Sequence, residues 1–318
     1  MKQQEMTEAQ KLIAMAEDTV TLNPDYLDED IMIIDKVKAL SVSNDIRPNM
    51  NIIAICTEGK MQAKLNGEHL DVHAYQVFIC PINASLEDIM VTPDFEYSAL
   101  CVTNRALQLY LRHFIYVWNE AVYVQKIRSF ELKSRYIEIY KRMYDLIKMW
   151  LDQGEDDMNE WYRDEVIKGL VSASLVGFCG LIQKQMTNTV QEPKRHILLF
   201  NQFLNLLQKT KNKHQTVEYY PSELCISSKY LTVICKKNSG KTANEWITEY
   251  TLADISYYLR NTSLTIKEIS NNLGFPNPSF FGKYVKDHFG CTPLEYKRKR
   301  QSEKSCLDHK AERIRIKH

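Results

Sequence analysis

Residues 265–297 read TIKEISNNLGFPNPSFFGKYVKDHFGCTPLEYK, and this stretch contains a regular series of helix boundaries. Its Thr-Ile-Lys-Glu start has the spacing of a capping box, and Gly274 supplies the left-handed residue that ends a short helix. Asn277, followed by proline, caps a second helix, which Gly290 ends before a Thr-Pro-Leu-Glu segment opens a third. Two helices joined by a tight turn are typical of a helix-turn-helix unit.

The same order of boundaries occurs once more upstream. A short helix with Pro221 in its first turn leads to Ser227, which caps a helix over residues 228–237. Gly240 ends that helix, and a Thr-Ala-Asn-Glu capping box then opens a helix over residues 243–260. The sequence therefore predicts an all-α region of two helix-turn-helix units joined by a long helix.

This region resembles the DNA-binding domain of the AraC family of bacterial transcription regulators over about residues 197–298. The first unit matches the family more loosely than the second. The matching residues of the second unit are Ile266, Ile269, Gly274, Phe275, Ser279, Phe281, Lys286, Gly290, Thr292, Pro293, Tyr296 and Lys297, whereas Val285 stands where the family usually has phenylalanine. The resemblance implies a sequence-specific, DNA-binding transcription regulator of the AraC type that reads two successive major-groove segments.

The outward faces of the two reading helices predict the residues that contact DNA. In the second unit the stripe predicted to pack inward is Phe281, Tyr284, Val285 and His288. The base-reading candidates on the other face are Ser228, Lys229, Thr232 and Val233 in the first unit, and Pro278, Ser279, Gly282 and Lys283 in the second. The phosphate-contacting candidates are Lys236, Asn277 and Lys286.

These residue types have distinct chemistry at a base edge. A lysine such as Lys283 can donate to guanine O6 and N7, whereas Val233 can make only apolar contact with a thymine methyl group. Any single lysine on such a helix is more simply explained as part of a solvated face. The placement of several candidates on matched faces of two units favours DNA binding instead.

The distribution of charge agrees with a polyanionic partner. The whole chain carries a formal net charge of only +1, but residues 1–193 have 19 basic and 29 acidic side chains, a balance of −10. Residues 194–318 have 22 basic and 11 acidic side chains, a balance of +11. We expect the basic half to bind double-stranded DNA. Two solvated surfaces of opposite charge, without functional meaning, are the alternative.

The acidic half reads as strands followed by helices. Short strands are predicted between residues 31 and 103, and Asn66 with Gly67 is typical of a type I′ hairpin turn. Helical periodicity then covers residues 105–118, 131–152 and 159–187. The predicted fold class is α+β, with a small β-barrel, covering helices and the all-α region. By the order of its parts, the barrel is similar to the cupin-like front of AraC-family proteins.

The predicted domains are residues 1–190 for sensing and dimerisation, residues 191–298 for DNA binding, and a basic, unstructured tail over residues 299–318. The helix over residues 159–187 combines an apolar stripe with small residues beside it. That helix either covers the barrel or forms the seam of a homodimer, and both readings stay open. A small-molecule effector in the barrel and contact with RNA polymerase are further partners that the resemblance allows.

A cupin-type metal-dependent enzyme, or a ligand-binding protein with an accessory DNA-binding region, is the alternative function. His69 and His73 lie four residues apart in a predicted strand, so their Cα atoms would be about 13 Å apart, too far to share one metal ion. The sequence also lacks a nucleophile elbow, a phosphate loop and a His-Glu-x-x-His motif. We therefore predict no enzyme activity, no catalytic residue, no metal and no cofactor.

The sequence also predicts where the protein acts. The apolar stretch over residues 169–182 is shorter than the roughly 20 residues of a membrane span, and the polar, acidic start is unlike a secretory signal. We expect a cytoplasmic protein without a membrane partner. The eight cysteines are scattered and contain no Cys-x-x-Cys pair, which is typical of reduced, buried thiols.

Overall fold

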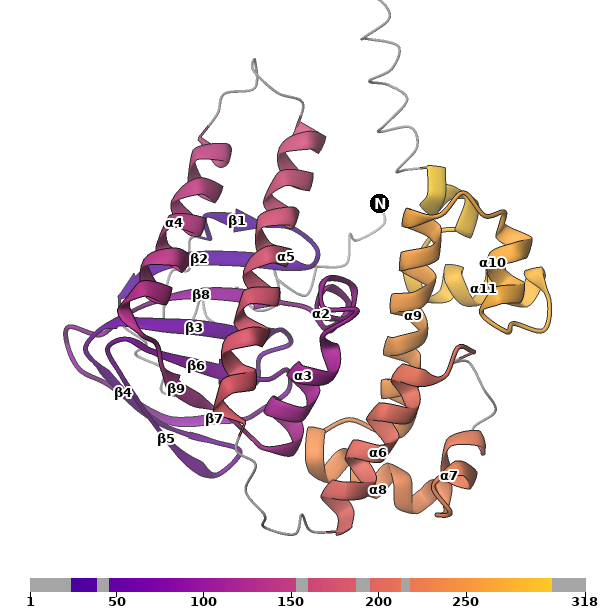
Figure 1. The fold of residues 1–318 in the computed structure, drawn as a ribbon, viewed down its shortest axis with the longest axis horizontal. Coiled ribbons are helices and arrows are strands. Elements are labelled where there is room, and N and C mark those ends of the chain that lie inside the picture. Colours follow the sequence, from indigo (N-terminus) through magenta and orange to yellow (C-terminus); the bar gives the residue numbers. More distant parts are fainter. Residues whose placement is uncertain (1–23, 39–45, 153–159, 187–194, 213–217, 299–318) are drawn as a thin grey trace, which may run out of the picture. The chain divides into compact units, whose positions relative to one another are not determined.

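The computed structural model describes residues 24–38, 46–152, 160–186, 195–212 and 218–298. The described chain divides into two compact units, one ending at Ile197 and the other beginning at Leu198 (Figure 1). The first unit holds the strands and five helical segments, and the second is helical. This order confirms the predicted α+β class. The predicted tail over residues 299–318 lies outside the described residues.

The described strands form two antiparallel sheets. Their bounds are β1 Tyr26–Leu27, β2 Ile31–Lys38, β3 Asn51–Glu58, β4 Lys60–Leu65, β5 Glu68–His73, β6 Gln76–Cys80, β7 Leu86–Val91, β8 Glu96–Val102 and β9 Ser129–Glu131. One sheet has the order β1-β2-β8-β3-β6-β9, and the other has the order β5-β4-β7. The strands predicted between residues 31 and 103 are present, whereas β1 and β9 lie outside that range. Closure of the two sheets into a barrel stays a prediction.

The hairpin between β4 and β5 follows directly from its sequence. Asn66 and Gly67 have φ angles of +52° and +77°, the two positive values that a type I′ turn requires. Along β5 the burial alternates, so that Leu70 and Val72 point inward while His69 and His73 are exposed.

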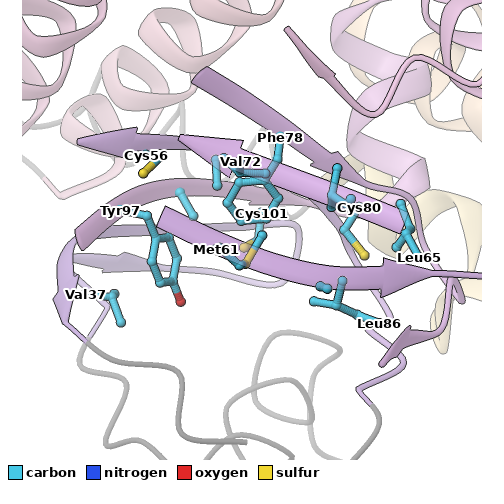
Figure 2. Packing of buried hydrophobic residues seen from close by; sticks show 14 of the residues in the cluster. Val37, Cys56, Met61, Leu65, Val72, Phe78, Cys80, Leu86, Tyr97 and Cys101 are labelled. Atoms are coloured by element: carbon cyan, nitrogen blue, oxygen red, sulfur yellow. The ribbon is translucent and has the colours of Figure 1, made fainter. Parts of the chain in front are cut away.

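An apolar core fills the space between the two sheets (Figure 2). Phe78 on β6 and Tyr97 on β8 meet there with ring centroids 6.2 Å apart. Cys80 and Cys101 are both paired with Ile52 from opposite sides, and burial raises the pKa of each thiol to about 12. These thiols therefore behave as core residues.

Helical segments cover the other face of the six-stranded sheet. Their bounds are α2 Asn104–Tyr110, α3 Ile115–Asn119, the π-helix η1 Glu120–Val124, α4 Ser134–Leu151 and α5 Glu160–Gln185. Helices α4 and α5 run side by side (Figure 1). Phe178 on α5 packs against Trp118 on α3 and Phe130 on β9, at centroid distances of 6.4 and 5.8 Å. The helix predicted over residues 105–118 is thus two helices with a break between them.

The structure of α5 bears on the two interpretations of its sequence, a cover for the barrel or the seam of a homodimer. By length and composition alone it could cross a membrane, a test that core helices of soluble proteins also pass. Its predicted apolar stripe faces inward, with Ile167, Val171 and Ile182 buried. The small residues Gly169 and Ala173 are exposed. The stripe therefore covers the sheet, and the small residues lie on the outer face.

The second unit contains six named helices and a final turn. Their bounds are α6 Arg195–Lys209, α7 Tyr219–Glu223, α8 Ser228–Ser239, α9 Ala243–Asn261, α10 Ile266–Asn272 and α11 Pro278–Phe289, and residues 293–298 are also helical. Helices α7 to α11 begin within about two residues of the predicted positions, whereas the sequence predicts no start for α6. Helix α6 buries Phe200 and Phe203 against the rings of Trp246 and Tyr220, at centroid distances of 6.0 and 5.7 Å.

Helices α10 and α11 share a separate core with the end of α9. Ile255 and Leu259 on α9 meet Ile269 on α10, and Phe281 and Val285 on α11 complete the cluster. The first helix-turn-helix unit consists of α7 and α8, with α6 packed on α7 and α9, and the second consists of α10 and α11, which share a core with the end of α9. Helix α11 is fixed to the end of α9 by the apolar core that the two share with α10.

Candidate nucleic-acid interface

The N-terminal ends of α8 and α11 are built alike. The backbone N–H of Tyr230 donates to Ser227 Oγ at 3.2 Å, and the backbone N–H of Phe280 donates to Asn277 Oδ1 at 2.8 Å. A serine or asparagine cap therefore precedes each helix, as the sequence predicts. Counted from these caps, the base-reading candidates occupy the first, second, fifth and sixth positions of both helices.

The structure places these candidates on the outer faces of the two helices. In α8, Leu231 and Cys235 are buried, whereas Ser228, Lys229 and Val233 are exposed and Thr232 is half-buried. Val233 has 53% of its surface exposed. That exposure suits a residue whose partner is the methyl group of a base.

Helix α11 presents a similar but smaller surface. Pro278, Ser279 and Lys283 are exposed, and Gly282 lies between them. A Cβ atom added at Gly282 would meet no described atom within 4 Å, so no described residue covers the helix at this point. Backbone without side chains here would let a nucleic-acid surface approach closely.

The inward stripe of α11 is narrower than the sequence predicts. Phe281 and Val285 are buried, and Tyr284 is half-buried with burial raising the pKa of its hydroxyl. His288 is exposed, and its ring stacks on Tyr284 at a centroid distance of 4.5 Å. In the last turn, Phe289 and not His288 packs against the core formed with α9 and α10.

The phosphate candidates also occupy matched places. Lys236 and Lys286 are both the ninth residue of their helices, lie in the last turn and are exposed. Asn277 is exposed, but its Oδ1 atom is used in capping α11. Its side-chain NH₂ is therefore the group that can donate to a phosphate oxygen.

Acidic residues close the N-terminal ends of three helices in this region, but not those of the two reading helices. Capping-box glutamates close the N-terminal ends of α9, α10 and the helical residues 293–298, namely Glu245, Glu268 and Glu295. The first turns of α8 and α11 contain no acidic residue. The positive end of the helix dipole is therefore uncompensated at the two ends where a phosphate would approach.

Two exposed aromatic residues were missed as candidates. Tyr230 and Phe280 are the third residues of α8 and α11, and both are exposed. Their recurrence at the same distance from each cap was visible in the sequence. Periodicity alone assigns aromatic residues to a core, so it could not predict their exposure.

One lysine counted in the positive balance is not available to DNA. Lys241 is buried between α8 and α9, where its Nζ atom lies 2.9 Å from Glu249 Oε1 and 4.7 Å from the centre of the Trp246 ring. This charge is compensated inside the protein, so Lys241 is a structural residue.

A cupin-type enzyme would need a metal-binding group among the residues before Ile197. The described residues there contain no group of three or more histidine, cysteine, aspartate or glutamate side chains that could hold a metal ion. His69 and His73 lie exposed on the outer face of the three-stranded sheet, opposite Lys64 and Lys60.

Comparison with known proteins agrees with this geometry. Residues 221–299 match the helix-turn-helix domain family. The chain is 28% identical over 102 residues to the Msm operon regulatory protein of Streptococcus mutans, covering 32% of this chain and 37% of that protein. It is 30% identical over 94 residues to the lactose operon transcription activator of Staphylococcus xylosus, covering 30% of this chain and 34% of that protein.

Solved structures extend the comparison. ToxT from Vibrio cholerae is 11% identical with a TM-score of 0.33, covering 84% of this chain and 98% of ToxT. The C-terminal domain of AraT, a response regulator from Geobacillus stearothermophilus, is 24% identical with a TM-score of 0.31, covering 34% of this chain and 89% of that domain.

Residues 221–299 therefore form a helix-turn-helix domain of the AraC type, in agreement with the resemblance of the sequence. The chain spans about a third of the length of the two operon regulators that it matches.

Proposed function

We propose that this protein is a sequence-specific, DNA-binding transcription regulator. The observation that supports the proposal is the matched pair of reading helices, α8 and α11, with exposed candidates at the same four positions. The two lysines at their ninth positions and the uncompensated helix ends favour phosphate contacts on both sides of each reading face. DNA-binding regulators act on chromosomal DNA, which fits the predicted cytoplasmic location.

A binding experiment on the full chain tests this proposal. The protein is incubated with a random library of duplex DNA, and the selected sequence is then titrated between about 50 and 200 mM salt. We expect a selected sequence, and an affinity that falls steeply with salt because bound lysines release counterions from the phosphates. An affinity that does not change over this salt range would contradict the proposal.

Two lysine variants separate the predicted roles. Lys286→Ala should weaken all duplexes about equally and lower the salt slope by about one, because a phosphate contact carries no base information. Lys283→Ala should relax the preference at one position of the selected sequence. Lys60→Ala, which removes an exposed lysine from β4, is the matched control and should leave both properties unchanged.

We also propose that the protein is a homodimer through the outer surface of α4 and α5. Helix α4 exposes Ile139, Leu146 and Met149, with 50% of the surface of Ile139 and 65% of that of Met149 accessible. On α5, added Cβ atoms at Gly169 and Gly180 would meet no described atom within 4 Å, so a second helix could approach closely. Exposed apolar stripes of this kind are commonly covered by a partner.

Sedimentation of the full chain tests the dimer. The wild-type protein should sediment as a dimer at micromolar concentration. A charge placed in the stripe by Met149→Lys should shift it toward monomer, whereas Gln62→Lys on the exposed face of β4 should have no effect. A wild-type monomer, with and without DNA, would contradict the proposal. RNA polymerase contact and an effector stay predictions of the resemblance.

A further inference from the structure

Three glycines that follow helices α8, α10 and α11 have left-handed backbone conformations. Gly240, Gly274 and Gly290 have φ angles of +75°, +74° and +70°. A Cβ atom added at Gly240 or Gly290 would meet no described atom within 4 Å. At Gly274 the same atom would lie 2.8 Å from Cγ and 2.9 Å from both Cβ and Nδ2 of Asn212. Glycine is therefore needed at position 274 both for its φ angle and for this close contact.

Asn212 contacts the turn between α10 and α11 from the short segment that follows α6. It lies three residues after the end of α6, whose last turn is closed by hydrogen bonds from the Thr210 N–H and Thr210 Oγ1 to the Leu206 carbonyl, at 2.9 and 2.7 Å. Helix α6 itself is fixed in the first core through Phe200 and Phe203. The side chain of Asn212 thus connects the end of α6 to the turn between α10 and α11.

The contact lies close to the second reading helix. Gly274 is three residues before Asn277, the cap of α11, and the intervening Phe275 packs on Phe281 at a centroid distance of 5.0 Å. A displacement at Gly274 would therefore be transmitted to the N-terminal end of α11. Helix α9 connects the two helix-turn-helix units along the chain, and the contact of Asn212 with Gly274 restricts their relative twisting further.

We propose that Asn212 is a positioning residue, which fixes α11 relative to α8 and thereby sets the spacing between the two DNA segments that one protomer reads. This inference rests on the proposed function. It concerns the accuracy of that spacing and involves no new contact with DNA.

The glycines provide matched variants for a test. Gly274→Ala and Gly290→Ala impose the same left-handed strain, but only Gly274→Ala pushes against Asn212. Gly274→Ala should therefore lower the unfolding temperature more than Gly290→Ala does. Asn212→Gly removes the whole opposing side chain, so adding it to Gly274→Ala should restore the stability to the level of Gly290→Ala.

DNA binding then distinguishes positioning from simple packing. The full-length variants are titrated with the selected duplex and with versions that have one base pair added or removed between the two segments. Asn212→Gly should reduce the preference for the original spacing by about threefold or more, with affinity for the original site less affected. The double variant should regain stability but not the spacing preference, because the link is still missing.

Each result is decisive for the positioning role. An unchanged spacing preference in Asn212→Gly would overturn it, as would equal unfolding temperatures for Gly274→Ala and Gly290→Ala. A wild-type chain that binds a specific sequence at every spacing would overturn the positioning role alone. A chain that selects no sequence at all would overturn the proposed function as well.

Discussion

Cys225 has a left-handed backbone conformation, which a glycine has at the equivalent turn of the second helix-turn-helix unit. Its φ angle is +53°, and it lies in the turn between α7 and α8, at the place that Gly274 occupies between α10 and α11. Unlike the buried cysteines that the sequence predicts, Cys225 is exposed. A cysteine in the left-handed region is strained because its Cβ approaches the following carbonyl oxygen.

Replacing this cysteine by glycine should stabilise the first helix-turn-helix unit. The left-handed region costs an L-residue about 1–2 kcal/mol, and glycine's larger entropy loss offsets about 0.5–1 kcal/mol of that. We expect Cys225→Gly to raise the free energy of opening of α8 by about 0.5–1 kcal/mol, measured by native-state hydrogen exchange. Ser222→Gly, within helix α7, is the control and should be destabilising. Equal losses in both variants would show that Cys225 is unstrained.

Glu245 links the stability of α9 to pH. The backbone N–H of Thr242 donates to its carboxylate at 2.6 Å and lowers the pKa of Glu245 below its usual value. Because the pKa is lower in the folded chain than in the unfolded one, the carboxylate stabilises α9 above about pH 4.3, the unfolded value. This contribution is lost as the pH falls through the folded pKa.

The variant Glu245→Gln keeps a capping side chain without the charge. The wild-type chain should be more stable than Glu245→Gln at pH 7, and the difference should vanish as the pH falls through the lowered pKa of folded Glu245. Hydrogen exchange of α9 at several pH values measures it. A difference that does not depend on pH would mean that the charge of Glu245 contributes nothing.

At the scale of helices, the boundaries could be predicted wherever a side chain caps the backbone. The capping boxes at Thr242, Thr265 and Thr292 are all present, with hydrogen bonds of 2.6–3.2 Å in both directions. Asn277 and Ser227 cap α11 and α8 as predicted. Such signals are local, so they do not depend on the rest of the fold.

The elements that could not be predicted depend on distant partners. Strand β9 has three residues and exists because it pairs with β6, and β1 has two residues paired with β2. The π-helix η1 lies beyond the end of the helical pattern over residues 105–118, and Arg128 donates to its Val122 carbonyl at 2.7 Å. Periodicity also gave no reason to place Asn212 against Gly274, because that contact joins two turns far apart in the chain.

Helix α11 provides a variant whose effects on folding and on binding should be opposite. Gly282 lies in the helix interior and has open space around its missing Cβ. Gly282→Ala should therefore raise the helix stability by about 0.5–1 kcal/mol. It should also weaken DNA binding, because the added methyl group occupies the space into which a base edge would move.

Measurements on both properties are needed for Gly282→Ala. Hydrogen exchange of α11 gives the stability, and titration with the selected duplex gives the affinity. Gly282→Leu should lower the affinity further, because its side chain is larger. If Gly282→Ala were more stable and bound DNA as tightly as the wild-type chain, this face of α11 would not approach the bases.

The central claim concerns the C-terminal unit as a whole, in which one protomer reads two segments of DNA. Helix α9 has 19 residues and is therefore about 28 Å long, and side-chain reach brings the two reading faces to about one DNA turn apart. Two reading helices on one rigid unit should contact successive major-groove segments on the same face of the duplex. The charge of the unit, strongly positive in sequence, supports binding along such a length.

Footprinting of the selected duplex tests this claim most directly. We expect two protected segments, with Lys283→Ala changing base preference in one of them by about 1–3 kcal/mol and Thr232→Ala changing it in the other. Inserting about five base pairs between the segments turns them to opposite faces of the duplex and should greatly reduce affinity. Two results would contradict the account: unchanged affinity after the insertion, or preference changes for Lys283→Ala and Thr232→Ala at the same base pairs.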